Sequence, residues 1–198
     1  MKVLILIFLI ISFNTKLYAQ DYAKGYRAYN NGDYKAALKE FEPLALMGIP
    51  ELQVLVGEAY MTGEGEGVPI DYKKSLKFFQ LAANQNNKVG QHFLGHMYKM
   101  GKGVDINIQE AIKYYRMSAE QGFANAHNDL GNLYHYGMGV MKSKILAHMW
   151  YQIAAVNGYS TAKIYLAEEA AEMTEEQIHK SLMLSIQCIS SNYKYCEW

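Results

Sequence analysis

Apolar residues recur along the chain with the spacing of helices that bury one face. One such stripe comprises Ala126, Leu130, Leu133, Tyr134 and Gly137. It follows the i, i+4, i+7, i+8 spacing that places side chains on one side of a helix. Similar segments lie at 55–68, 93–104 and 129–140, and the Gly-Val pairs that end them recur every 36 residues. The pattern therefore predicts three helical repeats.

A second helix is predicted after each Gly-Val pair. It begins after Asp71, Asn107 and Ser143, which share one capping chemistry, because each side chain can accept a hydrogen bond from first-turn amides. It ends near Gly122 and Gly158, where glycine permits a left-handed cap. Each repeat is therefore expected to be a pair of helices.

Two further sets of residues recur at nearly the same 36-residue spacing. They are the aromatic pairs at 78–79, 114–115 and 150–151, and the glycines at 57, 95 and 131. A glycine inside a helix costs about 1 kcal/mol relative to alanine. Its recurrence predicts a point where a neighbouring helix comes very close. We expect the aromatic rings to pack against small residues between successive repeats.

The sequence resembles a known repeat family. Its consensus A-x-x-x-L-G-x-x-Y-x-x-G-x-G-V, then a capping residue, K-A, an aromatic pair and A-A-x-x-G, is similar to Sel1-like repeats, which are related to tetratricopeptide repeats. The resemblance implies an all-α, right-handed α-solenoid of antiparallel helix pairs, with repeats at 51–87, 88–123 and 124–159. It also implies a tetratricopeptide-like helix pair at 20–50 and capping helices at 160–198.

The first 19 residues are predicted to be a cleaved signal peptide. Lys2 precedes an apolar run at 3–13, and the small residue Ala19 precedes the expected cut. Eleven residues in a helix rise only about 16 Å, half of a bilayer's hydrocarbon core, which disfavours an uncleaved anchor. We therefore expect a periplasmic or secreted chain with no membrane span after cleavage.

Composition narrows the class of partner. The chain has 19 basic and 19 acidic side chains and a formal net charge of zero, so it lacks the basic character that nucleic-acid binding requires. An apolar fraction of 51% excludes a disordered chain. We expect a folded monomer that does not bind nucleic acid.

The chain's two cysteines, Cys188 and Cys196, are predicted to form a disulfide, because exported proteins meet an oxidising compartment. In one continuous helix their Cα atoms would lie about 12 Å apart, whereas a disulfide needs about 5.5 Å. The helix is therefore expected to stop and the chain to fold back over 190–194, with Asn192 in a left-handed conformation.

The first helix of each repeat carries the predicted partner-binding residues. In the tetratricopeptide-like geometry that the resemblance implies, positions flanking the buried stripe face the concave surface. Their side chains are polar, aromatic or flexible, which suits a specific protein groove. The predicted set is Glu58, Met61, His92, His96, Lys99, Asn128, Asn132, His135 and Tyr136.

Metal binding and catalysis are less well supported. His92 and His96 lie one helical turn apart and could share a metal ion, but there is no HExxH motif, and the same two positions one repeat later hold asparagine. Ser-x-x-Lys strings at 160–163 and 191–194 lack the partner motifs of penicillin-binding enzymes. We therefore predict no enzyme activity, no metal and no cofactor.

These features favour a non-enzymatic protein–protein interaction scaffold in the bacterial envelope that binds a partner through its concave face. The partner would be an envelope protein, a host protein or a toxin. The resemblance leaves open an immunity protein that neutralises an envelope-targeting toxin, for example a phospholipase effector. A cell-wall or β-lactam hydrolase is a second alternative, claimed for cysteine-rich members of the family. Those carry a cysteine pair in most repeats, whereas this chain carries one pair at its end.

Overall fold

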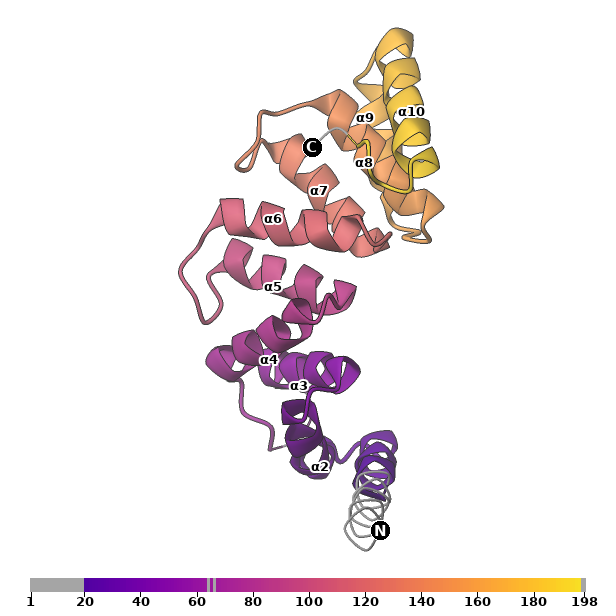
Figure 1. The fold of residues 1–198 in the computed structure, drawn as a ribbon. Helices are drawn as coiled ribbons and strands as arrows, with labels where there is room; N and C mark the ends of the chain where they lie inside the picture. The colour runs from indigo at the N-terminus through magenta and orange to yellow at the C-terminus, as the bar shows by residue number, and fades with distance from the viewer. Residues whose placement is uncertain (1–19, 64, 66, 197–198) are drawn as a thin grey trace, which may run out of the picture. The chain divides into compact units, whose positions relative to one another are not determined.

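A computed structural model describes residues 20–63, 65 and 67–196, and all regular elements in these residues are helices (Figure 1). The all-α repeat solenoid expected from the sequence is confirmed. The predicted signal peptide, residues 1–19, lies outside the described residues. Within the described ranges, no helix combines the length and the apolar character needed to cross a bilayer.

The chain divides into two units between Gln85 and Asn86. In the first unit, residues 20–30 are helical. They are followed by α2 (Tyr34–Leu46), α3 (Pro50–Thr62) and α4 (Tyr72–Asn84). The second unit contains α5 (Lys88–Met100), α6 (Ile108–Ala119), α7 (Ala124–Tyr136), α8 (Lys144–Val156), α9 (Ala162–Ala171) and α10 (Glu175–Ser190).

The second helix of each repeat begins where the sequence predicts. The Asn107 side chain accepts a hydrogen bond from the backbone N–H of Glu110 at 3.1 Å. The backbone N–H of Asn107 donates to the carbonyl of Tyr98, near the end of α5. Asp71 and Ser143 make the same two kinds of bond in their own repeats. Each bond joins the start of one helix to the end of the helix before it, and the middles of the two helices are in contact as well, so the helices of a repeat are antiparallel.

The glycine in the first helix of each repeat lies against an aromatic ring of the second helix. A Cβ at Gly95 would lie 2.8 Å from Cδ1 of Tyr115, and one at Gly131 would lie 2.6 Å from the ring of Tyr151. The predicted close approach is confirmed. The Tyr115 ring also belongs to the core cluster that includes Leu130 of the next repeat, as expected of rings that pack between repeats. The glycine contacts themselves lie within one repeat. The reason is that antiparallel pairing places the middle of the second helix beside the middle of the first.

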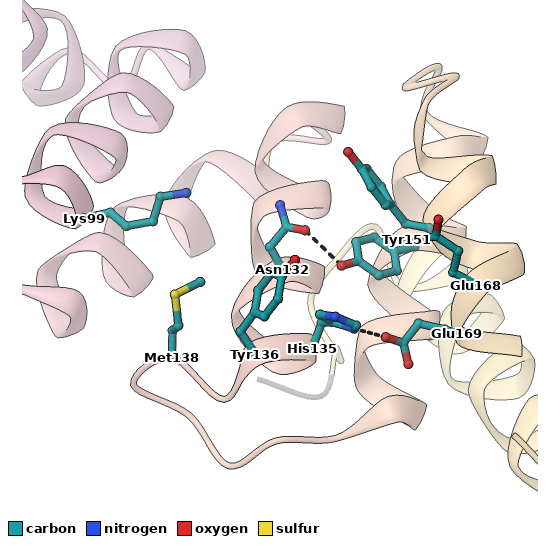
Figure 2. Close-up of a pocket in the computed structure, with 9 residues that line it drawn as sticks. Lys99, Asn132, His135, Tyr136, Met138, Tyr151, Glu168 and Glu169 are labelled. Atoms are coloured by element: carbon teal, nitrogen blue, oxygen red, sulfur yellow. Dashed lines mark hydrogen bonds and ion pairs between the residues drawn. The ribbon is translucent and has the colours of Figure 1, made fainter. Parts of the chain in front are cut away.

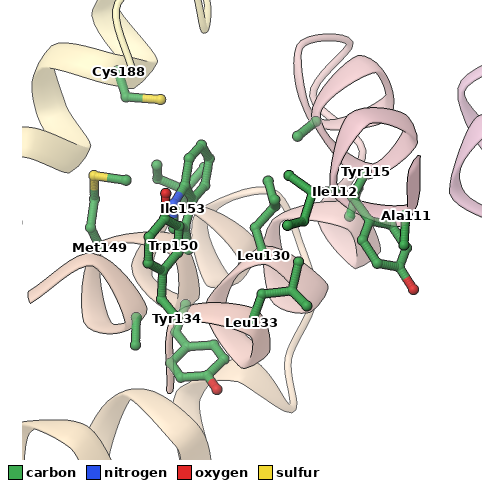
Figure 3. Packing of buried hydrophobic residues seen from close by; sticks show 14 residues of the cluster. Ala111, Ile112, Tyr115, Leu130, Leu133, Tyr134, Met149, Trp150, Ile153 and Cys188 are labelled. Carbon is green, nitrogen blue, oxygen red and sulfur yellow. The ribbon is translucent and has the colours of Figure 1, made fainter. Parts of the chain in front are cut away.

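The core of the second unit is built mainly from α6, α7 and α8 (Figure 3). Tyr115, Leu130 and Trp150 are among its largest fully buried side chains. Cys188 on α10 belongs to the same cluster and is also fully buried. The C-terminal helix therefore covers apolar surface of the last repeat that would otherwise face solvent, as a capping helix must.

After α10 the chain folds back on itself. Cys188 and Cys196 are joined by a disulfide, with their Cα atoms 4.5 Å apart. Asn192 and Tyr193 have left-handed backbone angles, with φ values of 54° and 63°. The fold-back places the Tyr193 ring against the ring of buried His127, with ring centroids 5.1 Å apart.

Candidate partner-binding site

Most of the predicted partner-binding residues lie on α5 and α7, the first helices of two successive repeats in the second unit. On α5 these are His92, His96 and Lys99, and on α7 they are Asn128, Asn132, His135 and Tyr136. Glu58 and Met61 lie half-buried on α3 in the first unit. The second unit therefore holds the larger predicted group.

Two side chains of α5 converge on Asp129 of α7. His92 Nε2 lies 2.8 Å from Oδ2 of Asp129, and Lys99 Nζ lies 3.3 Å from Oδ1. Burial by itself would raise the pKa of Asp129, but the hydrogen bond from His92 and the charge of Lys99 outweigh it and hold the pKa below its usual value. The carboxylate is therefore ionised at neutral pH and joins the two helices.

His92 and Asn128 are buried, with 8% and 7% of their surface exposed, although we expected both on an open face. His92 packs against the Tyr115 ring at 5.7 Å between centroids. The bonds to Asp129 hold α5 against α7, so the side of α5 that carries His92 is covered. His96 is half-buried; burial, and then the charge of nearby Lys99, lower its pKa, so its imidazole is neutral at neutral pH.

The sequence patterns considered for metal binding and catalysis can be located in the structure. In the part of the chain that the structure describes, no group of three or more His, Cys, Asp or Glu residues could hold a metal ion. Of the Ser-x-x-Lys strings, Ser160 and Lys163 are exposed. The hydroxyl of Ser191 donates to the carbonyl of Cys188 at 2.8 Å, as part of the C-terminal turn.

A pocket of about 290 Å³ is lined by residues of α5, of the second half of α7 and the loop after it, and of α8 and α9 (Figure 2). We call it the α7–α9 pocket. From the predicted set it is lined by Lys99, Asn132, His135 and Tyr136. The remaining lining residues are Met138, Tyr151, Tyr165, Glu168 and Glu169.

Two polar contacts hold the wall of this pocket. The Tyr151 hydroxyl donates to Oδ1 of Asn132 at 2.9 Å, and Nδ1 of His135 is paired with the buried carboxylate of Glu169 (Figure 2). Burial, and then the acidic Glu169, raise the pKa of Tyr151 well above its usual value. Its hydroxyl therefore stays protonated and keeps donating, so α7 is tied to both α8 and α9.

Tyrosine rings and a carboxylate remain accessible at the pocket. Tyr136 is 67% exposed, and its ring stands edge-on to His135 with centroids 4.4 Å apart. The Tyr165 ring lies 5.4 Å from the Tyr151 ring. Glu168 is exposed and makes no hydrogen bond or ion pair with another described residue. The pocket thus offers aromatic surface and one uncompensated negative charge.

Sequence reasoning missed several of these residues. Asp129 occupies the column that holds Leu55 and Phe93 in the earlier repeats, so an acid at an otherwise apolar position was the available signal. Glu168 and Glu169 lie on α9, after the last repeat, where no repeating column marks a position. Packing of α9 on α8 brings them to the pocket, where Glu169 pairs with His135 of α7.

Comparison with known proteins identifies the repeats. The Sel1 repeat model matches residues 50–87, 88–123 and 124–159. Among solved structures, the chain is similar to a Sel1 repeat protein from Oxalobacter formigenes, with 30% identity and a TM-score of 0.70, over 87% of this chain and 70% of that one. It is also similar in fold to a protective antigen of uropathogenic Escherichia coli that displays an SLR fold, with 24% identity and a TM-score of 0.59. That likeness covers 89% of this chain and 47% of the antigen. The comparison with curated proteins returned no match.

Proposed function

The chain belongs to the Sel1 repeat family, whose repeats generally mediate protein–protein interaction, and we propose that it is a non-enzymatic scaffold for a partner protein. The proposed contact surface is the exposed side of α5 and α7 in the second unit. We call it the α5–α7 face, and its residues are His96, Lys99, Met100, Asn132, His135 and Tyr136.

The observation that carries this proposal is the exposure of large side chains beside a polar pocket. Tyr136 is 67% exposed and Met100 is 53% exposed, each at the end of its helix. Tyrosine and methionine are enriched in protein interfaces, where an aromatic or flexible side chain fills a pocket of the partner. Asn132 and His135 supply directional polar groups next to Tyr136.

We propose further that the partner lies in the bacterial envelope or outside the cell. The pattern of residues 1–19, with a basic start, an apolar run and a small residue before the cut, supports export. The cysteine pair supports it as well, because disulfides persist in oxidising compartments.

Site-specific photo-cross-linking tests the proposed surface. A photoreactive phenylalanine analogue replaces Tyr136 in one variant and Tyr195 in a control, because Tyr195 is similarly exposed, at 71%, but lies in the C-terminal turn. We expect one discrete adduct from position 136 that position 195 does not give and that forms again with the purified partner. Equal labelling at both positions, or no adduct at 136, contradicts the proposal.

The nature of the captured partner separates the alternative functions. An envelope or host protein supports the scaffold. A toxin whose activity falls when the purified chain is added would favour the immunity role instead. Release of peptidoglycan fragments or cleavage of a β-lactam by the purified chain would overturn the non-enzymatic assignment.

A further inference from the structure

We propose that the α7–α9 pocket receives a basic side chain, lysine or arginine, from the bound partner. This inference rests on the proposed function and adds the chemistry that the partner must present. It depends on three features of the pocket, namely its aromatic surface, its charge and its position.

Three helices contribute tyrosine rings to the pocket. Tyr136 comes from α7 and Tyr151 from α8 (Figure 2), and Tyr165 comes from α9. A lysine or arginine cation is attracted to the face of such a ring when it comes within about 6 Å of the ring centre. Tyr151 is only 2% exposed and packs beside Tyr165, with ring centroids 5.4 Å apart, so it holds the Tyr165 ring in the pocket wall. Tyr136 and Tyr165 are therefore the rings that a cation can reach.

The charge balance of the pocket favours a cation. The ammonium group of Lys99, which lines the pocket, forms an ion pair with Asp129, and His135 is paired with Glu169. The carboxylate of Glu168 has no partner among the described residues. A basic side chain would therefore find an available carboxylate, whereas an anion would meet Glu168 while the Lys99 charge is already shared with Asp129.

The position of the pocket indicates a side chain of a bound protein as the occupant. Tyr136 both lines the pocket and belongs to the α5–α7 face, and most of its surface is accessible to solvent. A partner that covers Tyr136 can therefore place a long side chain into the pocket without leaving the interface. The aliphatic part of lysine or arginine would pack on the ring of Tyr136 while its charged end reaches Glu168.

Nuclear magnetic resonance titration of the purified protein, with its disulfide intact, tests this inference. The probes are a capped Gly-Arg-Gly peptide and its citrulline counterpart, which has nearly the same shape but no charge. We expect amide shifts confined to α7, α8 and α9, and binding of the arginine peptide about fivefold tighter than the citrulline peptide. Glu168→Gln should weaken arginine binding by a similar factor. Glu120→Gln removes the same charge from an exposed site outside the pocket and should leave binding unchanged.

Equal affinity for the two peptides, or equal effects of Glu168→Gln and Glu120→Gln, would overturn the inference, as would the absence of shifts. The two proposals can fail separately. If position 136 still cross-links a partner while the peptides are not distinguished, the proposed function stands and the pocket chemistry is wrong. If the peptides are distinguished but no partner cross-links, the pocket chemistry stands and the proposed function is wrong.

Discussion

Nε2 of His92 lies 2.8 Å from Oδ2 of Asp129, and this bond joins the first helices of two successive repeats. Lys99 adds a second bond to the same carboxylate, so the group is shared by two donors of α5. The contact is largely shielded from solvent, with 10% of the His92 side chain and 15% of the Asp129 side chain exposed. It is therefore a specific link between repeats, in addition to apolar packing.

Replacing Asp129 with asparagine should destabilise the fold, because Lys99 loses its carboxylate in a shielded site. We expect a loss of about 2–3 kcal/mol, less than the roughly 3–5 kcal/mol for breaking a fully buried pair, because Lys99 keeps some access to water. Urea unfolding followed by circular dichroism near neutral pH measures it. Asp105→Asn, at an exposed loop position, is the control and should leave the midpoint unchanged.

The same variant should also change the response to acid. The pKa of Asp129 in the fold lies below its ordinary value of 3.8. Its contribution is therefore present above pH 3.8 and is lost as the pH falls below that value. Asp129→Asn should lose less stability than the natural chain over this acidic range, and parallel losses in the two proteins would contradict the assignment.

Gly95→Ala should destabilise the protein although alanine is the better helix former. The added methyl group would lie 2.8 Å from the Tyr115 ring and 3.1 Å from the carbonyl of Ala111, and neither group is free to move away. Overpacking of this kind costs about 1–3 kcal/mol. In the Tyr115→Leu background the same change should cost much less, and a double-mutant cycle from urea midpoints measures the difference. Additive effects would show that glycine and ring do not compete for space.

Stability should fall as the pH drops from about 6.5 toward 4, because burial lowers the pKa of His127 to about 4. In the unfolded chain this histidine binds a proton at its ordinary pKa of 6.5, whereas in the fold it does so only near pH 4. Between these two pH values protonation therefore stabilises the unfolded state and not the fold. This histidine alone contributes about 3 kcal/mol across that range. The difference between unfolding midpoints at about pH 7 and about pH 4.5 should shrink in His127→Gln but not vanish, because burial lowers the pKa of His96 and His148 as well. The control His179→Gln, at an exposed position, should keep the full difference.

The disulfide between Cys188 and Cys196 should protect the C-terminal end of the last repeat. Closing a loop of this length stabilises a fold by about 2.5 kcal/mol in the chain-entropy model. Replacing both cysteines with serine should lower the urea midpoint and expose the Tyr193 turn to proteolysis. Thiol titration of the unfolded protein, purified without reductant, should find no free thiol, and two free thiols per chain would end this prediction.

Local features of this fold could be predicted from the sequence because they depend on residues close together in the chain. Asn107 caps α6 through an amide three residues away, and Asn192 takes the left-handed conformation expected of it. The glycine column predicted a close helix contact because a costly residue at a fixed step has few other causes. The repeat period itself predicted the fold class, since one helix pair cannot bury its apolar face alone.

Only the tertiary structure decided which side chains of α5 and α7 reach solvent. His92 and His96 look equivalent in sequence, one turn apart, yet His92 is buried because Asp129 approaches from the next repeat. Glu168 reaches the pocket because α9, outside the repeat pattern, packs on α8 beside Tyr151. Such contacts join residues about 30 or more positions apart. A repeating pattern does not encode them, because they depend on how neighbouring helices pack in space.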